Sequence, residues 1–130
     1  MLPEVDDEEI EKDAELMALG GGIVIGMGSE EFVSEIIREK AYLFLRKEVP
    51  YSLTVEVDSI RDKEKMIVVK AKILTNAERY KKMIIGKNGK KIKEIGFNAR
   101  KELELMSARK VFLELTVEVD RHWAERALAA

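Results

Sequence analysis

Hydrophobic positions along the chain follow two periods, and each period predicts a different kind of element. Between residues 29 and 49 the apolar residues recur at helical spacing, which predicts a helix with one apolar face. The side chain of Ser29 is suited to cap the start of this helix, and Pro50 ends the segment. The predicted apolar face consists of Phe32, Val33, Ile36, Ile37, Leu43 and Phe44.

Strict alternation of apolar and polar residues then predicts two strands. Residues 52–58 place Leu53, Val55 and Val57 on one side, and residues 66–74 continue the same pattern. The polar residues 61–65 lie between them and are predicted to be a turn. Two neighbouring strands with a short charged connection favour an antiparallel hairpin.

Two helices and a final strand follow the hairpin. Asn76 is predicted to cap a short helix over residues 77–85, and a longer helix follows Gly89. Gly96 inside the longer helix predicts the close approach of a neighbouring backbone, because glycine costs helix stability there. The core stripe of the longer helix is Ile92, Ile95, Ala99, Leu103 and Met106. Residues 110–119 alternate again, so the order α-β-β-α-α-β predicts an α+β domain in which helices cover one three-stranded sheet.

The two ends of the chain differ from this middle part in composition. Residues 1–19 hold eight acids and one base, a net charge of −7, whereas residues 20–130 hold 22 Lys and Arg against 17 Asp and Glu, a net of +5. Residues 1–28 are therefore predicted to be an acidic tail and a flexible glycine-rich linker, an added edge strand in the linker being the alternative. The domain is predicted at 29–120, and residues 121–130 as a C-terminal tail with a short helix, where Trp123 packs at one end of the sheet.

Composition excludes several classes of site. The chain has no cysteine and one histidine, so thiolate metal sites, disulfides and multi-histidine metal sites are excluded. No apolar run approaches the roughly 20 residues of a membrane-spanning helix, and the acidic start differs from a secretory signal. No pair of carboxylates stands in an apolar context. We therefore expect a cytoplasmic protein that is not an enzyme and has no metal and no cofactor.

One lysine-rich segment, residues 84–95, carries the chemistry. Six of the thirteen residues 81–93 are lysine and none is acidic. Gly86 can end the first helix in a left-handed conformation, Gly89 lets a ligand backbone approach, and the next helix starts with unpaired N–H groups. Isoleucines beside this charged turn offer an apolar surface for unstacked bases, an arrangement that suits a single strand. The predicted RNA-binding residues are Ile84, Ile85, Gly86, Lys87, Asn88, Gly89, Lys90, Lys91, Ile92 and Lys93.

This glycine-bracketed loop between two helices, after a hairpin and before a strand, resembles the KH domain in its type II arrangement. Within that family the chain is most similar to the C-terminal KH domain of the Era GTPases. The stretches that carry the resemblance are residues 34–40, 48–57, 82–96, 99–103 and 115–123. The resemblance implies binding of single-stranded RNA, namely the 3′ end of small-subunit ribosomal RNA, during ribosome assembly. The sequence contains no Walker loop, so the GTPase domain of that family would belong to a missing segment or to another chain.

A second hypothesis remains open at this point. A KH-shaped domain could serve as a structural or protein-interaction module that binds little RNA, and the net charge of −7 in residues 1–19 favours this alternative. If the tail folds back on the lysines, it should compete with RNA. Arg79, Lys81 and Lys82 are further candidates for RNA contact, because they lie on the helix that leads into the loop.

Overall fold

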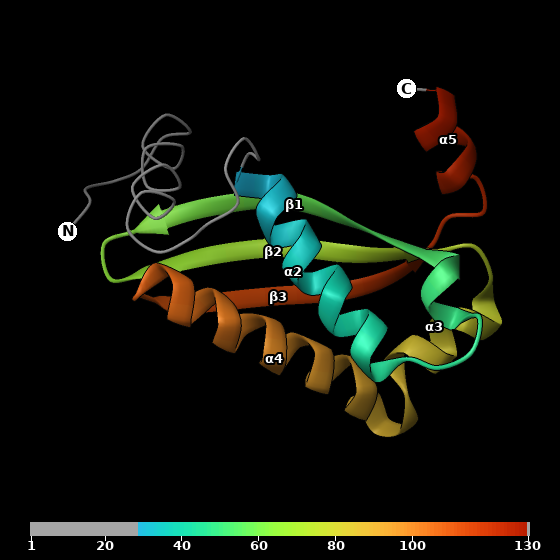
Figure 1. The fold of residues 1–130 in the computed structure, drawn as a ribbon, viewed down its shortest axis with the longest axis horizontal. Helices are drawn as coiled ribbons and strands as arrows, with labels where there is room; N and C mark the ends of the chain where they lie inside the picture. The colour runs from blue at the N-terminus through green and yellow to red at the C-terminus, as the bar shows by residue number, and fades with distance from the viewer. Residues whose placement is uncertain (1–28, 130) are drawn as a thin grey trace.

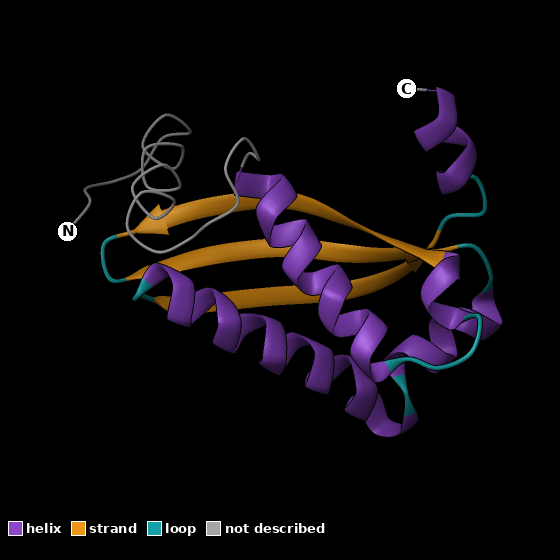
Figure 2. Ribbon diagram, viewed as in Figure 1, coloured by secondary structure: helices purple, strands orange, loops and turns teal. Residues whose placement is uncertain are grey.

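The computed structural model describes residues 29–129, and the predicted tail and linker at residues 1–28 lie outside the described residues. Figures 1 and 2 show that the described chain follows the predicted order α-β-β-α-α-β, with one more helix at its end. The elements are α2 (Ser29–Phe44), the 3₁₀ helix η1 (Val49–Ser52), β1 (Leu53–Lys63), β2 (Met66–Thr75), α3 (Glu78–Ile85), the 3₁₀ turn η2 (Lys87–Gly89), α4 (Lys90–Ser107), β3 (Lys110–Val119) and α5 (Trp123–Ala129).

The three strands form one mixed sheet in the order β1-β2-β3. Strands β1 and β2 pair antiparallel, as the predicted hairpin requires, whereas β2 and β3 pair parallel. A parallel pair needs a long crossover connection, and α3, η2 and α4 supply it. The α3–α4 loop therefore lies on the path of this crossover, beyond the end of the sheet at which β2 finishes (Figure 1).

The hairpin differs from its prediction in length. Only Glu64 and Lys65 form the turn, and β1 continues to Lys63 through the segment predicted as part of a polar turn. A register shift between Val57 and Ser59 marks a β-bulge. Because a bulge inserts one residue into a strand, it changes which positions face inward. Before the bulge the odd-numbered residues face inward, and after it the even-numbered ones do. Asp62 is therefore buried.

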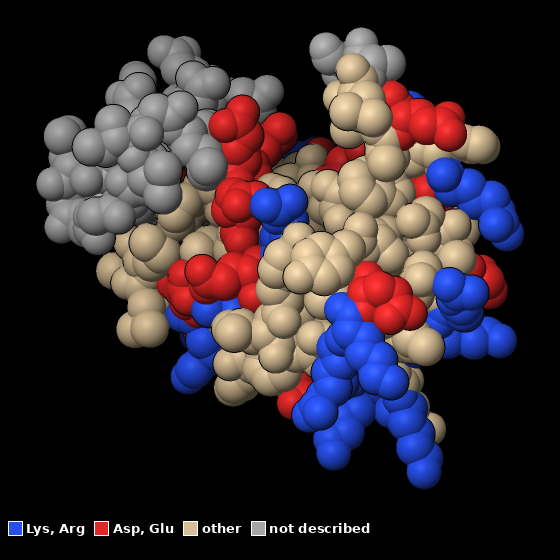
Figure 3. Space-filling model, turned by 45° about the vertical axis from the view of Figure 1, so that its right-hand side comes forward, with Lys and Arg blue, Asp and Glu red and all other residues tan. Residues whose placement is uncertain are grey.

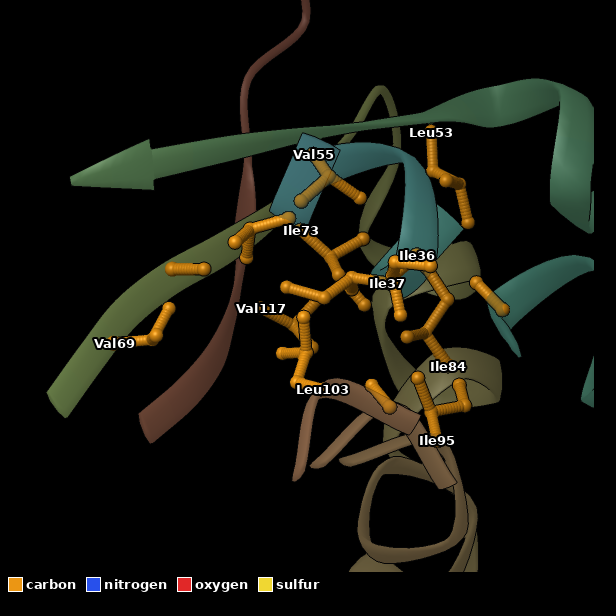
Figure 4. Close-up of a cluster of buried hydrophobic side chains, with 14 of the residues drawn as sticks. Ile36, Ile37, Leu53, Val55, Val69, Ile73, Ile84, Ile95, Leu103 and Val117 are labelled. Carbon is orange, nitrogen blue, oxygen red and sulfur yellow. The ribbon is translucent and has the colours of Figure 1, made fainter. Parts of the chain in front are cut away.

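Helices α2 and α4 cover one face of the sheet (Figures 1 and 2). The buried side chains converge between them and the strands, and Figure 4 shows this cluster in close-up. Ile37 from α2, Ile73 from β2, Ile84 from α3 and Ile95 from α4 are all 0% exposed. Every layer of the domain thus contributes to one core, which holds the two helices on either side of the α3–α4 loop in place.

The apolar face of α2 is only partly as predicted. Phe32, Val33, Ile36 and Ile37 are buried, but the side chain of Leu43 is 68% exposed. Ala41 and Leu45 are buried; Ala41 lies four residues after Ile37 and Leu45 four residues after Ala41, which is the spacing of one helix face. Ala41 has a small side chain and was not included in the predicted apolar face.

Three local predictions on the helices are wrong. Ser29 is the first residue of α2, and its buried hydroxyl has no hydrogen-bond partner among the residues described. The N-cap of α3 is Ala77, without a side-chain hydrogen bond, instead of Asn76. Apart from its chain neighbours and the backbone of its own helix, no atom of the described residues lies within 4 Å of the place where a Cβ on Gly96 would stand, so no backbone of a neighbouring described element approaches it. Glycine is therefore not required at position 96 for packing within this domain.

Side-chain hydrogen bonds join the ends of neighbouring elements. The backbone N–H of Val111 donates to Glu104 (3.0 Å), which ties α4 to β3 and lowers the pKa of that carboxyl group. The indole N–H of Trp123 donates to the carbonyl of Ser52 (3.0 Å), so the start of α5 is held at the beginning of β1, as expected for a residue that packs at the end of the sheet. Across residues 29–129 the structure contains no helix suited to crossing a membrane.

Candidate nucleic-acid interface

The loop between α3 and α4 reverses the chain within four residues. Its turn depends on positive backbone angles at Gly86 (φ 77°, ψ 174°), Asn88 (φ 57°, ψ 26°) and Gly89 (φ 75°, ψ 13°). The angles of Gly86 fall in a region that is essentially restricted to glycine. Asn88 occupies the left-handed region, which asparagine and aspartate enter more readily than other side chains do. The order Gly-Lys-Asn-Gly thus suits the backbone that the loop adopts.

The two glycines have different surroundings. A Cβ on Gly86 would lie 2.6 Å from the Cβ of Lys91 and 2.9 Å from its backbone nitrogen, both far inside normal contact. A Cβ on Gly89 would meet no atom of the described residues within 4 Å beyond those of its two chain neighbours. Gly86 is therefore required for the close contact of the loop with α4, while the space beside Gly89 is open to a ligand.

We expect Gly86→Ala to lower the free energy of unfolding by about 3 kcal/mol, because strain in a glycine-only region and steric overlap are each worth roughly 1–3 kcal/mol. The matched control is Gly89→Ala, for which backbone strain of about 1–2 kcal/mol is the main cost. Urea unfolding of both variants measures the difference. Equal losses at the two positions would contradict the steric argument.

Hydrogen bonds within the chain already use several amides of the loop. The N–H of Gly86 donates to Lys82, that of Gly89 to Gly86, and that of Lys90 to Lys87. The first N–H of α4 is therefore not free, contrary to the prediction. The amides of Lys87 and Asn88 donate to no backbone carbonyl in the part of the chain described here. Lys87 and Asn88 are exposed residues, so their amides are the loop groups suited to hydrogen-bond a phosphate oxygen.

Positive charge surrounds these amides. Lys87, Lys90 and Lys93 are exposed, and within residues 29–129 none of them has an ion-pair partner, whereas Lys91 lies 3.7 Å from Glu94. Figure 3 shows Lys and Arg side chains projecting from the lower edge of the molecule, at the height at which Figure 1 draws the α3–α4 loop. Unpaired cations gathered at one place attract an anionic chain and hold it by charge.

Of the three isoleucines beside the loop, one lies in the core and two are partly exposed at the surface. Ile84 is 0% exposed and belongs to the core, so its side chain cannot line a surface groove as predicted. Ile84 instead anchors the end of α3, whose buried face it provides. Ile85 and Ile92 are partly buried, and both pack against the core. They retain some apolar surface on the two helices that flank the loop.

The additional candidates on α3 have mixed surroundings. The guanidinium of Arg79 donates to the hydroxyl of Tyr80 (2.9 Å) and lies 4.7 Å from the centre of its ring. This hydrogen bond raises the pKa of Arg79 and holds its side chain against α3. Lys82 is exposed and Lys81 is half-buried.

Sequence reasoning missed a hollow between the loop and the first turns of α4. It has a volume of about 490 Å³ and is open to the surface. Its lining residues are Asn88, Lys90, Lys93, Glu94, Phe97 and Asn98. The available signal was the spacing of Lys90, Lys93 and Phe97, which places them on one face of a helix. The sequence analysis of this helix considered only its apolar core stripe.

Comparison with known proteins identifies the fold around this loop. The model of the KH domain family matches residues 48–124. The GTPase Era of Aquifex aeolicus (strain VF5) is 45% identical over 96 residues, which make up 72% of this chain and 32% of that protein. The GTPase Era of Thermotoga maritima is 43% identical over 94 residues, 72% of this chain and 31% of that protein. The chain thus spans about a third of the length of these relatives.

Solved structures agree with the sequence comparison. The structure of Era in complex with MgGDPNP and nucleotides 1506–1542 of 16S ribosomal RNA superposes with a TM-score of 0.74 at 41% identity, covering 78% of this chain and 34% of that one. A variant of Aquifex aeolicus Era bound to GDP·AlF₄⁻ gives a TM-score of 0.73 at 42% identity, over 77% of this chain and 34% of that one. The fold is the predicted type II arrangement, and the family match covers more than half of the residues. The chain belongs to the KH domain family.

Proposed function

We propose that this domain binds single-stranded RNA, with the sugar-phosphate backbone held at the Gly86–Gly89 loop. The observation that carries the proposal is the pair of amides of Lys87 and Asn88, which, within residues 29–129, donate to no backbone carbonyl and lie among lysines without an ion-pair partner. Loops with two glycines in KH domains clamp four backbone nucleotides. No chemical step is required of such a site, so we infer a binding module without catalytic activity.

In this proposal each part of the loop has its own task. A phosphate accepts hydrogen bonds from the two amides, and Lys87, Lys90, Lys91 and Lys93 neutralise its neighbours along the strand. Ile85 and Ile92 contact the bases, and Ile84 supports them from the core. Gly86 shapes the turn and Gly89 leaves room for the strand.

The RNA that we propose is the 3′ end of small-subunit ribosomal RNA. The support is the similarity of this chain to the part of Era that it matches, because one of the superposed Era structures contains nucleotides 1506–1542 of 16S ribosomal RNA. Binding of that RNA would place the domain in ribosome assembly in the cytoplasm. The GTPase activity of the relatives would belong to a segment outside the matched region.

Titration with a panel of short single-stranded RNAs, including the ribosomal 3′ tail, tests the proposal. With about four phosphates neutralised at roughly −0.7 per phosphate, the slope of log K against log salt should be about −3. A duplex of the same sequence is the control and should bind more weakly, since unstacked bases are needed. A slope near zero, or equal affinity for the duplex, would contradict the proposal.

A second candidate function rests on a different surface. Tyr42 and Tyr51 are 43% and 77% exposed and form an edge-to-face pair with ring centres 6.2 Å apart. Exposed aromatic residues are enriched at protein interfaces. A structural or protein-interaction role of the KH fold is therefore the alternative, and it becomes the better explanation if no RNA of the panel binds.

A further inference from the structure

Phe97 has unusual surroundings for an exposed aromatic residue. Its side chain lies on α4 two helical turns beyond the loop and is 52% exposed. The hollow that it lines extends from the ring toward the start of the helix, where Lys90, Lys93 and the loop residue Asn88 complete it. An apolar ring at one end and the nucleic-acid loop at the other make this hollow continuous with the site proposed above.

The charges around the hollow suit a nucleic-acid strand. Lys90 and Lys93 have no ion-pair partner among the described residues, and Glu94 lies 3.7 Å from Lys91. The guanidinium carbon of Arg100 and the Nζ of Lys101 lie over the Phe97 ring, 5.3 and 5.7 Å from its centre. These two cations follow Phe97 along α4, whereas Lys90, Lys93 and Glu94 of the hollow precede it.

We propose that the RNA strand leaving the Gly86–Gly89 loop continues over the outer face of α4 and stacks one base on Phe97. A phosphate of this strand lies between Lys90 and Lys93. At 1.5 Å rise per residue, Phe97 is about 10 Å along the helix axis from Lys90, so the base is beyond the nucleotides held by the loop. Stacking on an aromatic ring tolerates any base. This inference rests on the proposed function and extends its footprint.

The experiment compares RNAs of two lengths on Phe97→Ala. One probe is an eight-nucleotide single strand from the 3′ end of small-subunit ribosomal RNA, about twice the four-nucleotide footprint of a KH loop, and the other is a four-nucleotide piece of it. We expect Phe97→Ala to weaken binding of the longer strand by roughly five- to 150-fold and to leave the shorter one unchanged. Phe97→Tyr retains a ring and should bind both strands as the parent does.

Two further variants make the result specific. Phe112→Ala is the matched control, because Phe112 is also about half exposed (51%) but lies on β3, outside the hollow. It should bind both strands as the parent does. Phe97→Trp places an indole in the hollow, and its fluorescence should change when the longer strand is added and not when the shorter one is.

The outcomes separate this inference from the proposed function. Unchanged binding of the longer strand by Phe97→Ala, or equal loss for both lengths, overturns the stacking site. If loop substitutions at Lys87 and Asn88 still abolish binding in that case, the proposed function stands without it. If the loop substitutions also have no effect, both fail.

Discussion

Replacing Lys87 and Asn88 together by aspartate should weaken binding of single-stranded RNA by at least about a hundredfold. The change removes one cation and places two carboxylates beside the amides that are proposed to hold a phosphate. Like charges brought together at an interface cost several kcal/mol, and about 2.7 kcal/mol corresponds to a hundredfold change in affinity. The measurement is a titration at low salt, where charge effects are least screened.

The fold should survive this double substitution. Both side chains are exposed, and aspartate enters the left-handed region that position 88 adopts at φ 57°. Circular dichroism and urea unfolding check that the domain is intact. Lys65→Asp, in the β1–β2 turn far from the loop, is the control for a general loss of positive charge and should have a much smaller effect (Figure 1). RNA binding equal to that of the parent would remove the loop from the site.

Arg109→Met should lower the free energy of unfolding by about 3–5 kcal/mol, the cost of removing one member of a buried ion pair. The guanidinium of Arg109 donates to both carboxylate oxygens of Asp62 and to the carbonyl of Lys63 (3.0 Å). The side chain of Asp62 is only 2% exposed. Since Asp62 lies near the end of β1 and Arg109 just before β3, this pair holds the hairpin against the connection between α4 and β3.

A more exposed pair of the same residue types provides the control. Arg126 and Asp120 are ion-paired at 2.5 Å, with side chains 55% and 26% exposed. Exposed ion pairs contribute about 0–1 kcal/mol, so Arg126→Met should change stability little. Urea unfolding measures both variants. Equal losses in the free energy of unfolding for Arg109→Met and Arg126→Met would contradict the argument that burial strengthens the Asp62–Arg109 pair.

Periodicity in the sequence was sufficient to predict the order of the elements. Residues 110–119 alternate in all but one position, Phe112, and β3 occupies Lys110–Val119 as expected. The glycine-bracketed turn between the two helices was also predicted, and both Gly86 and Gly89 adopt positive φ there. In both cases the backbone conformation depends on residues adjacent in the chain.

The burial of individual side chains was harder to predict. Ile84 and Ile85 are neighbours of the same type, yet Ile84 is fully buried and Ile85 is only partly so. Which of them faces inward depends on how α3 packs against the rest of the domain. Asp62 illustrates the same limit, since an acid in a polar stretch is buried only because a bulge redirects it toward Arg109, 47 residues away.

The sequence by itself thus determined the element order, the mixed α+β class and the loop proposed to bind phosphate, because helix, strand and turn preferences act between residues a few positions apart. Only the tertiary structure decided the parallel pairing of β3 with β2, the buried Asp62–Arg109 pair and the hollow that joins Phe97 to the loop. These features form between residues distant in sequence or on helix faces left free by the core. Their positions depend on packing that no local pattern encodes.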